Sequence, residues 1–149
     1  MFSTQYKDVI EFQIPTNPKY VAFIRKSVRC IAEEMSFSEN EAEDVEIAVG
    51  EAVTNSIVHG KPDSGEGTIT VRCRRRKNAL DIFIEDEGRC MCIPSAQVPP
   101  PDHEEHGRGY LLMNQLMEHV QVRCTERGLL LSMTKKHRPR RGGKLAAAG

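Results

Sequence analysis

The chain has little that would suit a nucleic-acid surface or a membrane. Its 149 residues include no Trp, and aromatic residues make up 5%, which argues against a base-stacking surface. Lys+Arg and Asp+Glu both number 21, so the formal net charge is zero and gives no reason to expect nucleic acid or an acidic membrane surface as a partner. The N-terminus lacks a signal-peptide core, and no apolar run approaches membrane-spanning length. We therefore expect a cytoplasmic protein.

The cysteines do not form a recognisable framework. They are odd in number and irregularly spaced: Cys30, Cys73, Cys90, Cys92 and Cys124. This pattern predicts reduced thiols rather than a disulfide scaffold. A metal site that combines Cys90 and Cys92 with His103 and His106 is the alternative, but the spacing matches no usual zinc pattern.

Hydrophobic periodicity predicts a single domain of strands and helices. The length suits one domain with a substantial core. Alternating apolar residues predict five strands, with a hairpin turn at Lys77-Asn78 and a second turn near Gly128. The expected strands are residues 8–14, 68–76, 80–86, 119–124 and 129–134. The arginines that alternate along 68–76 predict a solvated face of an antiparallel sheet.

Three helices are expected between these strands. Asn17-Pro18 is typical of an N-cap followed by proline, and the first helix runs from there to about Met35. Ser38 and Glu41 form a capping box that opens the second, which ends at Gly60. The third follows Gly107 and Gly109 and covers 110 to about 119. Its inward residues are expected to be Leu112 and Leu116.

The second helix carries polar residues within an apolar pattern. Glu51 and Asn55 are four positions apart, so they share one face, and His59 extends that face by another turn. An inward carboxylate and amide cost free energy unless something pairs with them. Carboxylate and amide oxygens suit Mg²⁺, which keeps most of its waters. The alternative is a partly exposed Glu and Asn on the helix flank.

A second polar position lies at the end of the strand 80–86. The alternation places Asp86 on the apolar face, and Gly88 permits a turn after it. The proline-rich loop 89–106 that follows is long enough to be functional or disordered. Beyond it, Gly107-Arg108-Gly109 precedes a helix, where free backbone N–H groups favour an anion. Glycine there can also simply start a helix.

The C-terminal residues differ from the rest in composition. Residues 135–141 read KKHRPRR, which predicts a solvated basic tail, with a partner-binding arm as the alternative. Residues 142–149 read GGKLAAAG and are typical of an appended expression-vector remnant. We therefore expect a domain over residues 1–136 and a tail over 137–149.

These features in this order resemble one superfamily. A helix with E-x-x-x-N, a strand that ends in D-x-G and a glycine-led helix after a loop resemble the histidine-kinase-like (Bergerat-type) ATPases. The stretch EIAVGEAVTNSIVHG is most similar to the small anti-sigma-factor serine/threonine-protein kinases. The resemblance covers about residues 8–136. It implies an α+β two-layer sandwich, in which helices cover one face of a mixed, mostly antiparallel sheet.

The resemblance also implies roles for individual residues. Glu51 would be the general base, Asn55 would hold Mg²⁺ on ATP, and Asp86 would accept a hydrogen bond from adenine. Arg108 would contact the terminal phosphates. The full cofactor-binding set that the resemblance implies is Asn55, His59, Asp86, Gly88, Gly107, Arg108 and Gly109.

Two departures from the family pattern bear on activity. The second glycine expected after Asp86 is replaced by Cys90. The threonine often found after the glycine of the final hairpin is replaced by leucine after Gly128, so that contact is missing or is supplied by Ser132. Cys90 and the absent threonine favour a nucleotide-binding module with weak or no kinase activity, whereas the presence of both Glu51 and Asn55 favours an active kinase.

The resemblance implies partners as well. It predicts a homodimer that binds a sigma factor and phosphorylates a STAS-type anti-sigma-factor antagonist. The kinase half of a two-component sensor is a further alternative, but the chain shows no helix pair that carries a phospho-accepting histidine.

Overall fold

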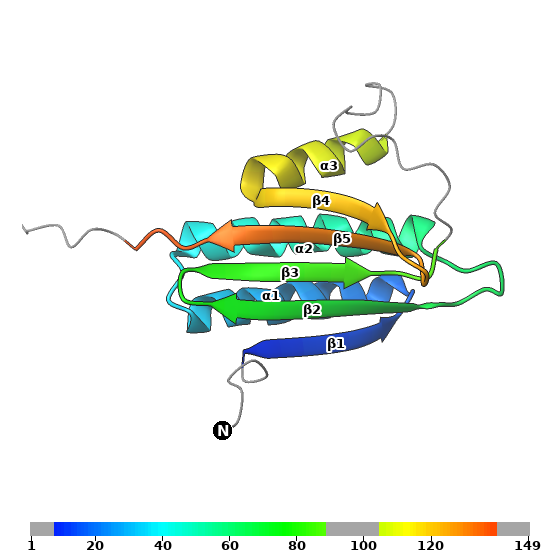
Figure 1. The fold of residues 1–149 in the computed structure, drawn as a ribbon, viewed down its shortest axis with the longest axis horizontal. Coiled ribbons are helices and arrows are strands. Elements are labelled where there is room, and N and C mark those ends of the chain that lie inside the picture. The colour runs from blue at the N-terminus through cyan, green and yellow to red at the C-terminus, as the bar shows by residue number, and fades with distance from the viewer. Residues whose placement is uncertain (1–7, 89–104, 140–149) are drawn as a thin grey trace, which may run out of the picture.

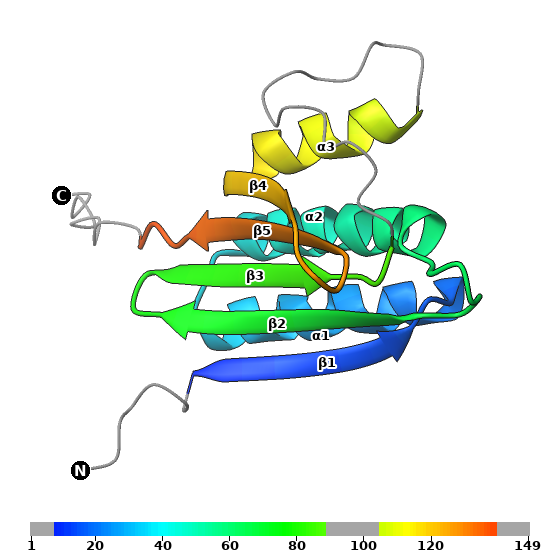
Figure 2. The ribbon, with the colours of Figure 1, turned by 45° about the vertical axis from the view of Figure 1, so that its right-hand side comes forward.

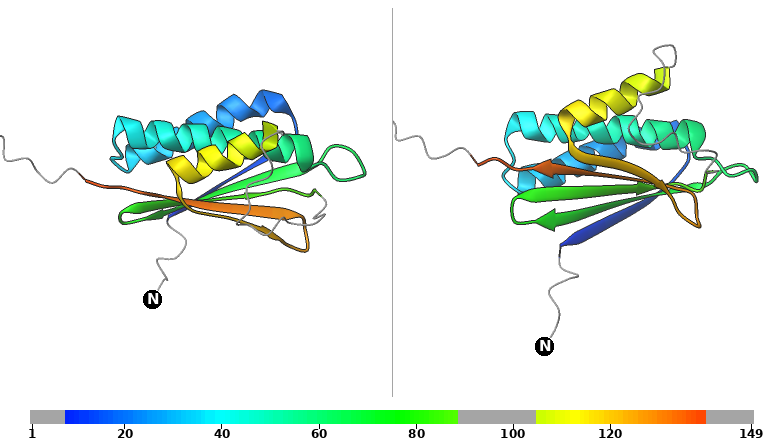
Figure 3. Two further views of the ribbon diagram at one scale, coloured as in Figure 1. Left: turned by 90° about the horizontal axis from the view of Figure 1, so that it is seen from above. Right: turned by 45° about the horizontal axis from the view of Figure 1, so that its top comes forward.

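A computed structural model describes residues 8–88 and 105–139, with no account of the side chains of 105–108. Its elements form one sheet and a layer of helices on one face of that sheet (Figures 1 and 3). In chain order they are β1 (Val9–Pro15), the 3-10 helix η2 (Pro18–Tyr20), α1 (Val21–Glu34), α2 (Glu39–His59), β2 (Thr68–Arg76), β3 (Ala79–Glu85), α3 (Glu105–Leu116), β4 (Glu118–Cys124) and β5 (Leu129–Lys136).

The sheet has five strands in the order β1-β2-β3-β5-β4. The four pairings between these strands are all antiparallel. β1 lies at one edge, and β4 lies at the other edge next to α3 (Figure 2). The predicted two-layer α+β sandwich is confirmed, with an antiparallel rather than a mixed sheet among the described strands.

The predicted helix start is confirmed at α2, whereas the cap predicted at Asn17 opens the 3-10 helix η2 and α1 begins only at Val21, without a side-chain cap. The side chain of Asn17 accepts a hydrogen bond from the Lys19 N–H at 3.1 Å, and Pro18 opens η2 directly before α1. At α2, the Ser38 hydroxyl accepts from the Glu41 N–H at 3.1 Å, and the Glu41 carboxylate accepts from the Ser38 N–H at 3.3 Å. These side chains satisfy backbone donors that a helix start leaves free.

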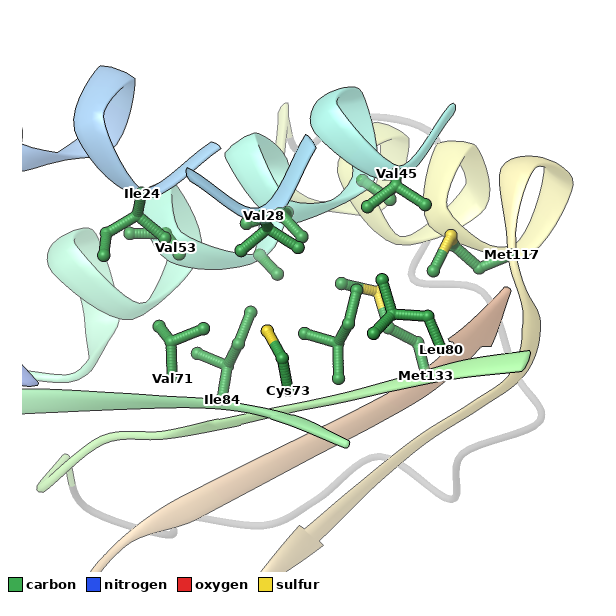
Figure 4. Close-up of a cluster of buried hydrophobic side chains, with 14 of the residues drawn as sticks. Ile24, Val28, Val45, Val53, Val71, Cys73, Leu80, Ile84, Met117 and Met133 are labelled. Carbon is green, nitrogen blue, oxygen red and sulfur yellow. The ribbon is translucent and has the colours of Figure 1, made fainter. Parts of the chain in front are cut away.

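The core fills the space between the helices and the sheet (Figure 4). Fully buried side chains come from both layers: Ile24 and Val28 of α1, Val45, Val49 and Val53 of α2, Val71 and Cys73 of β2, and Leu80 and Ile82 of β3. The alternation of β2 and β3 therefore matches the predicted apolar face. Burial raises the pKa of the Cys73 thiol to about 12, so this thiol stays protonated and packs as an apolar group.

The third helix begins and ends earlier than expected. α3 starts at Glu105, so Gly107 and Gly109 lie inside it rather than before it. It ends at Leu116 instead of about residue 119, where His119 has a φ of 53°, in the left-handed region that interrupts a helix. The inward residues are also shifted. Met113 and Met117 are buried, whereas Leu112 and Leu116 are only partly buried.

The cysteine prediction is wrong at one position. Cys124 is disulfide-bonded, whereas Cys30 and Cys73 are free thiols. Spacing along the chain does not reveal which cysteines a fold brings within bonding distance. The alternative metal site falls on residues or side chains outside the described part of the structure.

The start of the basic run is not solvated as predicted. Lys135 is 9% exposed and belongs to β5, and His137 hydrogen-bonds to Glu41 at 2.8 Å. The His137 ring also stacks on Phe37, with ring centroids 5.0 Å apart. Continued alternation along β5 explains the burial of Lys135, because residues two apart share a face. Within the described residues, no helix is both long enough and apolar enough to span a membrane.

Candidate functional site

The polar face of α2 lies opposite the start of α3. A Cβ atom on Gly109 would be 2.9 Å from Oε2 of Glu51 and 3.5 Å from Nδ2 of Asn55, so the backbone of α3 passes directly over both side chains. Both are partly buried. Neither forms a hydrogen bond or ion pair with any residue that the structure describes. A carboxylate and an amide are therefore held together with their polar atoms available to a ligand.

Asp86 provides the second part of the site, just after β3. It is 4% exposed, as its predicted position on the apolar face requires. Its Oδ1 accepts hydrogen bonds from the N–H of Gly88 at 2.9 Å and of Leu129 at 3.4 Å. Its own N–H donates to the Leu129 carbonyl at 3.0 Å. Oδ2 accepts from none of the described residues, so this carboxylate is fixed at one oxygen and free at the other.

Glycines surround Asp86 at contact distance. A Cβ on Gly60 would lie 2.6 Å from Cγ of Asp86, and one on Gly88 would lie 2.7 Å from the Cα of Gly60. A Cβ on Gly128 would collide with the Asp86 carbonyl oxygen and lie 2.9 Å from the Cα of Glu87. The end of α2, the turn after β3 and the start of β5 can approach this closely only because these positions carry no side chain.

The structure brings most of the predicted site together along α2. Asn55 lies one turn beyond Glu51 on α2. Asp86 and the glycines around it, here called the Asp86 frame (Gly60, Asp86, Gly88 and Gly128), meet the end of this helix at Gly60. His59 lies in the last turn of α2 and is exposed. Gly107 and Arg108 lie in the first turn of α3, but their side chains are outside the described part.

Ser132 does not replace the missing threonine. It lines a cavity of about 280 Å³ with Arg74, Asp81 and Phe83 on the sheet face that points away from the helices. Its neighbour Leu131 points into the core. The alternation of a strand therefore places Ser132 on the opposite face from the site.

Sequence reasoning missed two contributors to the site. The sequence pattern predicts only a helix stop at Gly60 and a turn at Gly128, yet both lie against Asp86. A second opening also went unnoticed. A cavity of about 330 Å³ between α1 and α2 is lined by Arg25, Arg29 and Glu46 and reaches Glu51. Glu51 is therefore approached from the α3 side and from the α1 side.

The chain is similar to known proteins over most of its length. Residues 14–135 match the model of the Histidine kinase-like ATPase domain. The chain is 36% identical over 138 residues to the serine-protein kinase RsbW of Bacillus licheniformis, which covers 86% of this chain and 85% of that protein. The serine-protein kinase RsbW of Bacillus subtilis is 32% identical over 137 residues, with the same coverage.

A solved structure supports the fold independently. The RsbU and RsbW domains of a Mycobacterium tuberculosis protein superpose with a TM-score of 0.66 at 16% identity, over 88% of this chain and 33% of that one. At this identity the likeness concerns the fold alone. Together with the two Bacillus relatives and the matched domain, it leads to one assignment: the chain belongs to the histidine kinase-like ATPase family and, within it, to the group of serine-protein kinases.

Proposed function

We propose that this protein is an anti-sigma factor that binds ATP with Mg²⁺ and phosphorylates a serine or threonine of an anti-sigma-factor antagonist. The observation that carries the proposal is the placement of Glu51 and Asn55 under Gly109, in line with the Asp86 frame along α2. The proposed base and metal ligand then lie on α2, and the proposed acceptor for an adenine amino group lies against the C-terminal end of that helix.

The residues present fit a magnesium–nucleotide complex. The free oxygen of Asp86 can accept a hydrogen bond from an exocyclic amino group, and Gly88 lets the backbone pass close to a base. The Asn55 amide oxygen is a suitable single protein ligand for Mg²⁺, which retains several waters. Gly107 and Gly109, with Arg108, would contact the phosphates from α3. When bound, ATP supplies the phosphoryl group, and Mg²⁺ neutralises part of the phosphate charge.

In this proposal Glu51 takes the proton of the attacking hydroxyl. It makes no hydrogen bond to any described residue, so its carboxylate is available for proton transfer. The cavity between α1 and α2 gives a protein substrate a route to Glu51 that does not cross the nucleotide side. Positioning and charge stabilisation by these groups account for most of the catalysis expected of phosphoryl transfer.

The remaining features of the proposal concern partners and location. A sigma factor and a STAS-type antagonist are the expected partners, and we expect a homodimer formed through the sheet edge and first helix, around residues 8–31. His59 would complete the cofactor-binding set. The working domain would comprise residues 1–136, and the protein would act in the cytoplasm. Light scattering that gives a monomer mass across micromolar concentrations would contradict the dimer.

One observation favours an alternative function. Ser132 lies on the outer sheet face, so its hydroxyl does not replace the expected threonine near the adenine position. This favours a regulatory module that binds nucleotide and has weak or no kinase activity. The two functions share the nucleotide site and differ only in whether the phosphoryl group is transferred.

The deciding experiment combines binding with transfer. Calorimetry with ATP or ADP and Mg²⁺ tests the site, and incubation with labelled ATP and candidate STAS-type antagonists tests transfer. Binding with transfer supports the kinase. Binding of nucleotide and partner without transfer supports the module, and no heat at millimolar nucleotide refutes both.

A further inference from the structure

A buried lysine joins three elements at the end of the helical layer opposite Asp86. Lys135 lies on the inner face of β5 and is 9% exposed. Its Nζ donates to Oδ2 of Asp44 on α2 at 2.9 Å and to the carbonyl oxygen of Leu116, the last residue of α3, at 2.6 Å. One ammonium group therefore bridges β5, α2 and α3.

The energetics argue against a role in packing alone. A buried charge is costly unless it is paired and hydrogen-bonded, and an apolar side chain would fill this position of β5 more cheaply. Helix ends leave carbonyl groups without intrahelical partners, and a cation at a helix C-terminus is favourable. The ammonium group of Lys135 meets both requirements at the end of α3.

The helix that Lys135 holds is the one that covers Glu51. α3 lies alongside α2 in the helical layer (Figure 3), and its Met113 is buried between the two contact points. At the C-terminal end, Lys135 fixes α3 to Asp44. Toward the N-terminal end, Gly109 packs over Glu51 and Asn55. A tilt of α3 at Leu116 would therefore change the distance between Gly109 and the α2 side chains.

We propose that Lys135 is a positioning residue that sets the placement of α3 over Glu51 and Asn55, and so controls contact with the terminal phosphates of ATP. The effect on ATP contact rests on the proposed function. The attachment of α3 by Lys135 does not depend on that function.

Lys135→Met tests the proposal, because it keeps the length of the side chain and removes the charge and the donors. Calorimetry with Mg²⁺ measures the ratio of ATP to ADP affinity, and amide hydrogen exchange measures the protection of residues 105–116. We expect the variant to bind ADP almost as wild type does and to have a ratio of ATP to ADP affinity about tenfold lower than wild type. We also expect amide exchange to accelerate, relative to wild type, more in α3 than in β3. Asp44→Asn, a milder change at the same bridge, should show the same pattern more weakly and replaces Lys135→Met if that variant does not fold.

Two control variants separate positioning from general stability. Ile69→Val lowers stability through a fully buried residue of β2, and Lys136→Met changes an exposed neighbour. Neither should alter the nucleotide ratio or the exchange of α3 relative to β3. If Lys135→Met lowers the melting temperature as Ile69→Val does and leaves both readouts unchanged, the lysine is structural only and the proposal is wrong. If wild type binds no nucleotide, the proposed function fails, and the exchange of α3 still decides whether Lys135 fixes this helix.

Discussion

Gly60 and Asp86 are in direct contact, although they are 26 positions apart in the sequence. A Cβ on Gly60 would lie 2.6 Å from Cγ of Asp86, which is closer than any side-chain carbon can remain. We predict that Gly60→Ala displaces Asp86, lowers the free energy of unfolding by about 1–3 kcal/mol and weakens nucleotide binding. Chemical denaturation and calorimetry measure the two effects.

Gly50→Ala is the matched control on the same helix. A Cβ there would meet only the Cδ of Arg25 at 3.6 Å, an ordinary contact. Glycine within a helix costs roughly 0.5–1 kcal/mol relative to alanine, so this variant should be more stable than wild type with unchanged nucleotide affinity. Equal losses in both variants would contradict the close approach of Gly60 and Asp86.

Asp86→Asn tests the adenine contact without a change of size. The amide would keep an acceptor but lose the charge, and a hydrogen bond to a charged group contributes about 1.5–3 kcal/mol. We therefore expect ATP and ADP affinities to fall by roughly tenfold or more, while inorganic phosphate analogues are unaffected. Unchanged ATP affinity would remove Asp86 from the site.

The fold could be predicted because most of its helices and strands follow from the periodicity of the sequence. Buried residues alternate with more exposed ones along β2, the apolar residues Leu80, Ile82 and Ile84 alternate along β3, and α2 carries a capping box and ends before a glycine. Each of these signals is local. The contacts of Asp86 with Gly60 and Gly128 are not local, because they depend on how closely three elements approach after folding. The sequence shows the glycines but not what each one contacts.

The charged residues show the same limit. The arginines of β2 were predicted to face solvent, and Arg74 and Arg76 are about half exposed, but both donate to the buried Asp81. Asp81 is opposite Arg74 in the register of β2 and β3, which the hairpin turn at Lys77-Asn78 fixes. A row of arginines in one strand of a hairpin and a single carboxylate opposite it in the next strand therefore indicate a cross-strand ion pair.

The Asp81 cluster predicts an acid-sensitive part of the stability. Burial by itself raises the pKa of Asp81, but hydrogen bonds from Arg76, Thr134 and Arg74 outweigh it and lower the pKa from 3.8 to about 2. Because the folded-state pKa is the lower one, the stabilisation is complete above about pH 4 and is lost as pH falls toward 2. This contribution is about 2 kcal/mol.

Denaturation between pH 5 and pH 2 measures this effect. Asp81→Asn should be less stable than wild type at pH 5, and the difference should shrink as the pH approaches 2. A constant difference across this range would show that Asp81 does not titrate as stated. Glu11 pairs with Arg72 on the surface of the same sheet, with both side chains at least 40% exposed, so Glu11→Gln serves as the control with little effect.

Gly109→Ala separates stability from catalysis in one residue. Alanine favours a helix by about 1 kcal/mol over glycine, so α3 should not be weakened. The new Cβ would lie 2.9 Å from Oε2 of Glu51, and that flexible carboxylate would move away. A misplacement of about 1 Å can cost ~100-fold in rate. We expect a stable protein with a large loss of phosphoryl transfer, and an unchanged transfer rate would show that Gly109 does not fix the position of Glu51.

Glu51→Gln distinguishes the kinase from the binding module. Glutamine keeps the size and hydrogen-bonding capacity of the side chain but cannot take the serine proton, and loss of a general base costs ~10²–10⁴-fold in rate. Nucleotide affinity should change little, because Asn55 still provides the metal ligand, and sigma-factor binding should survive because it requires no proton transfer. The expected variant is a constitutive inhibitor that no longer inactivates its antagonist. Transfer assays with purified antagonist, alongside calorimetry of the same samples, measure both properties, and transfer at the wild-type rate would show that Glu51 is not the base.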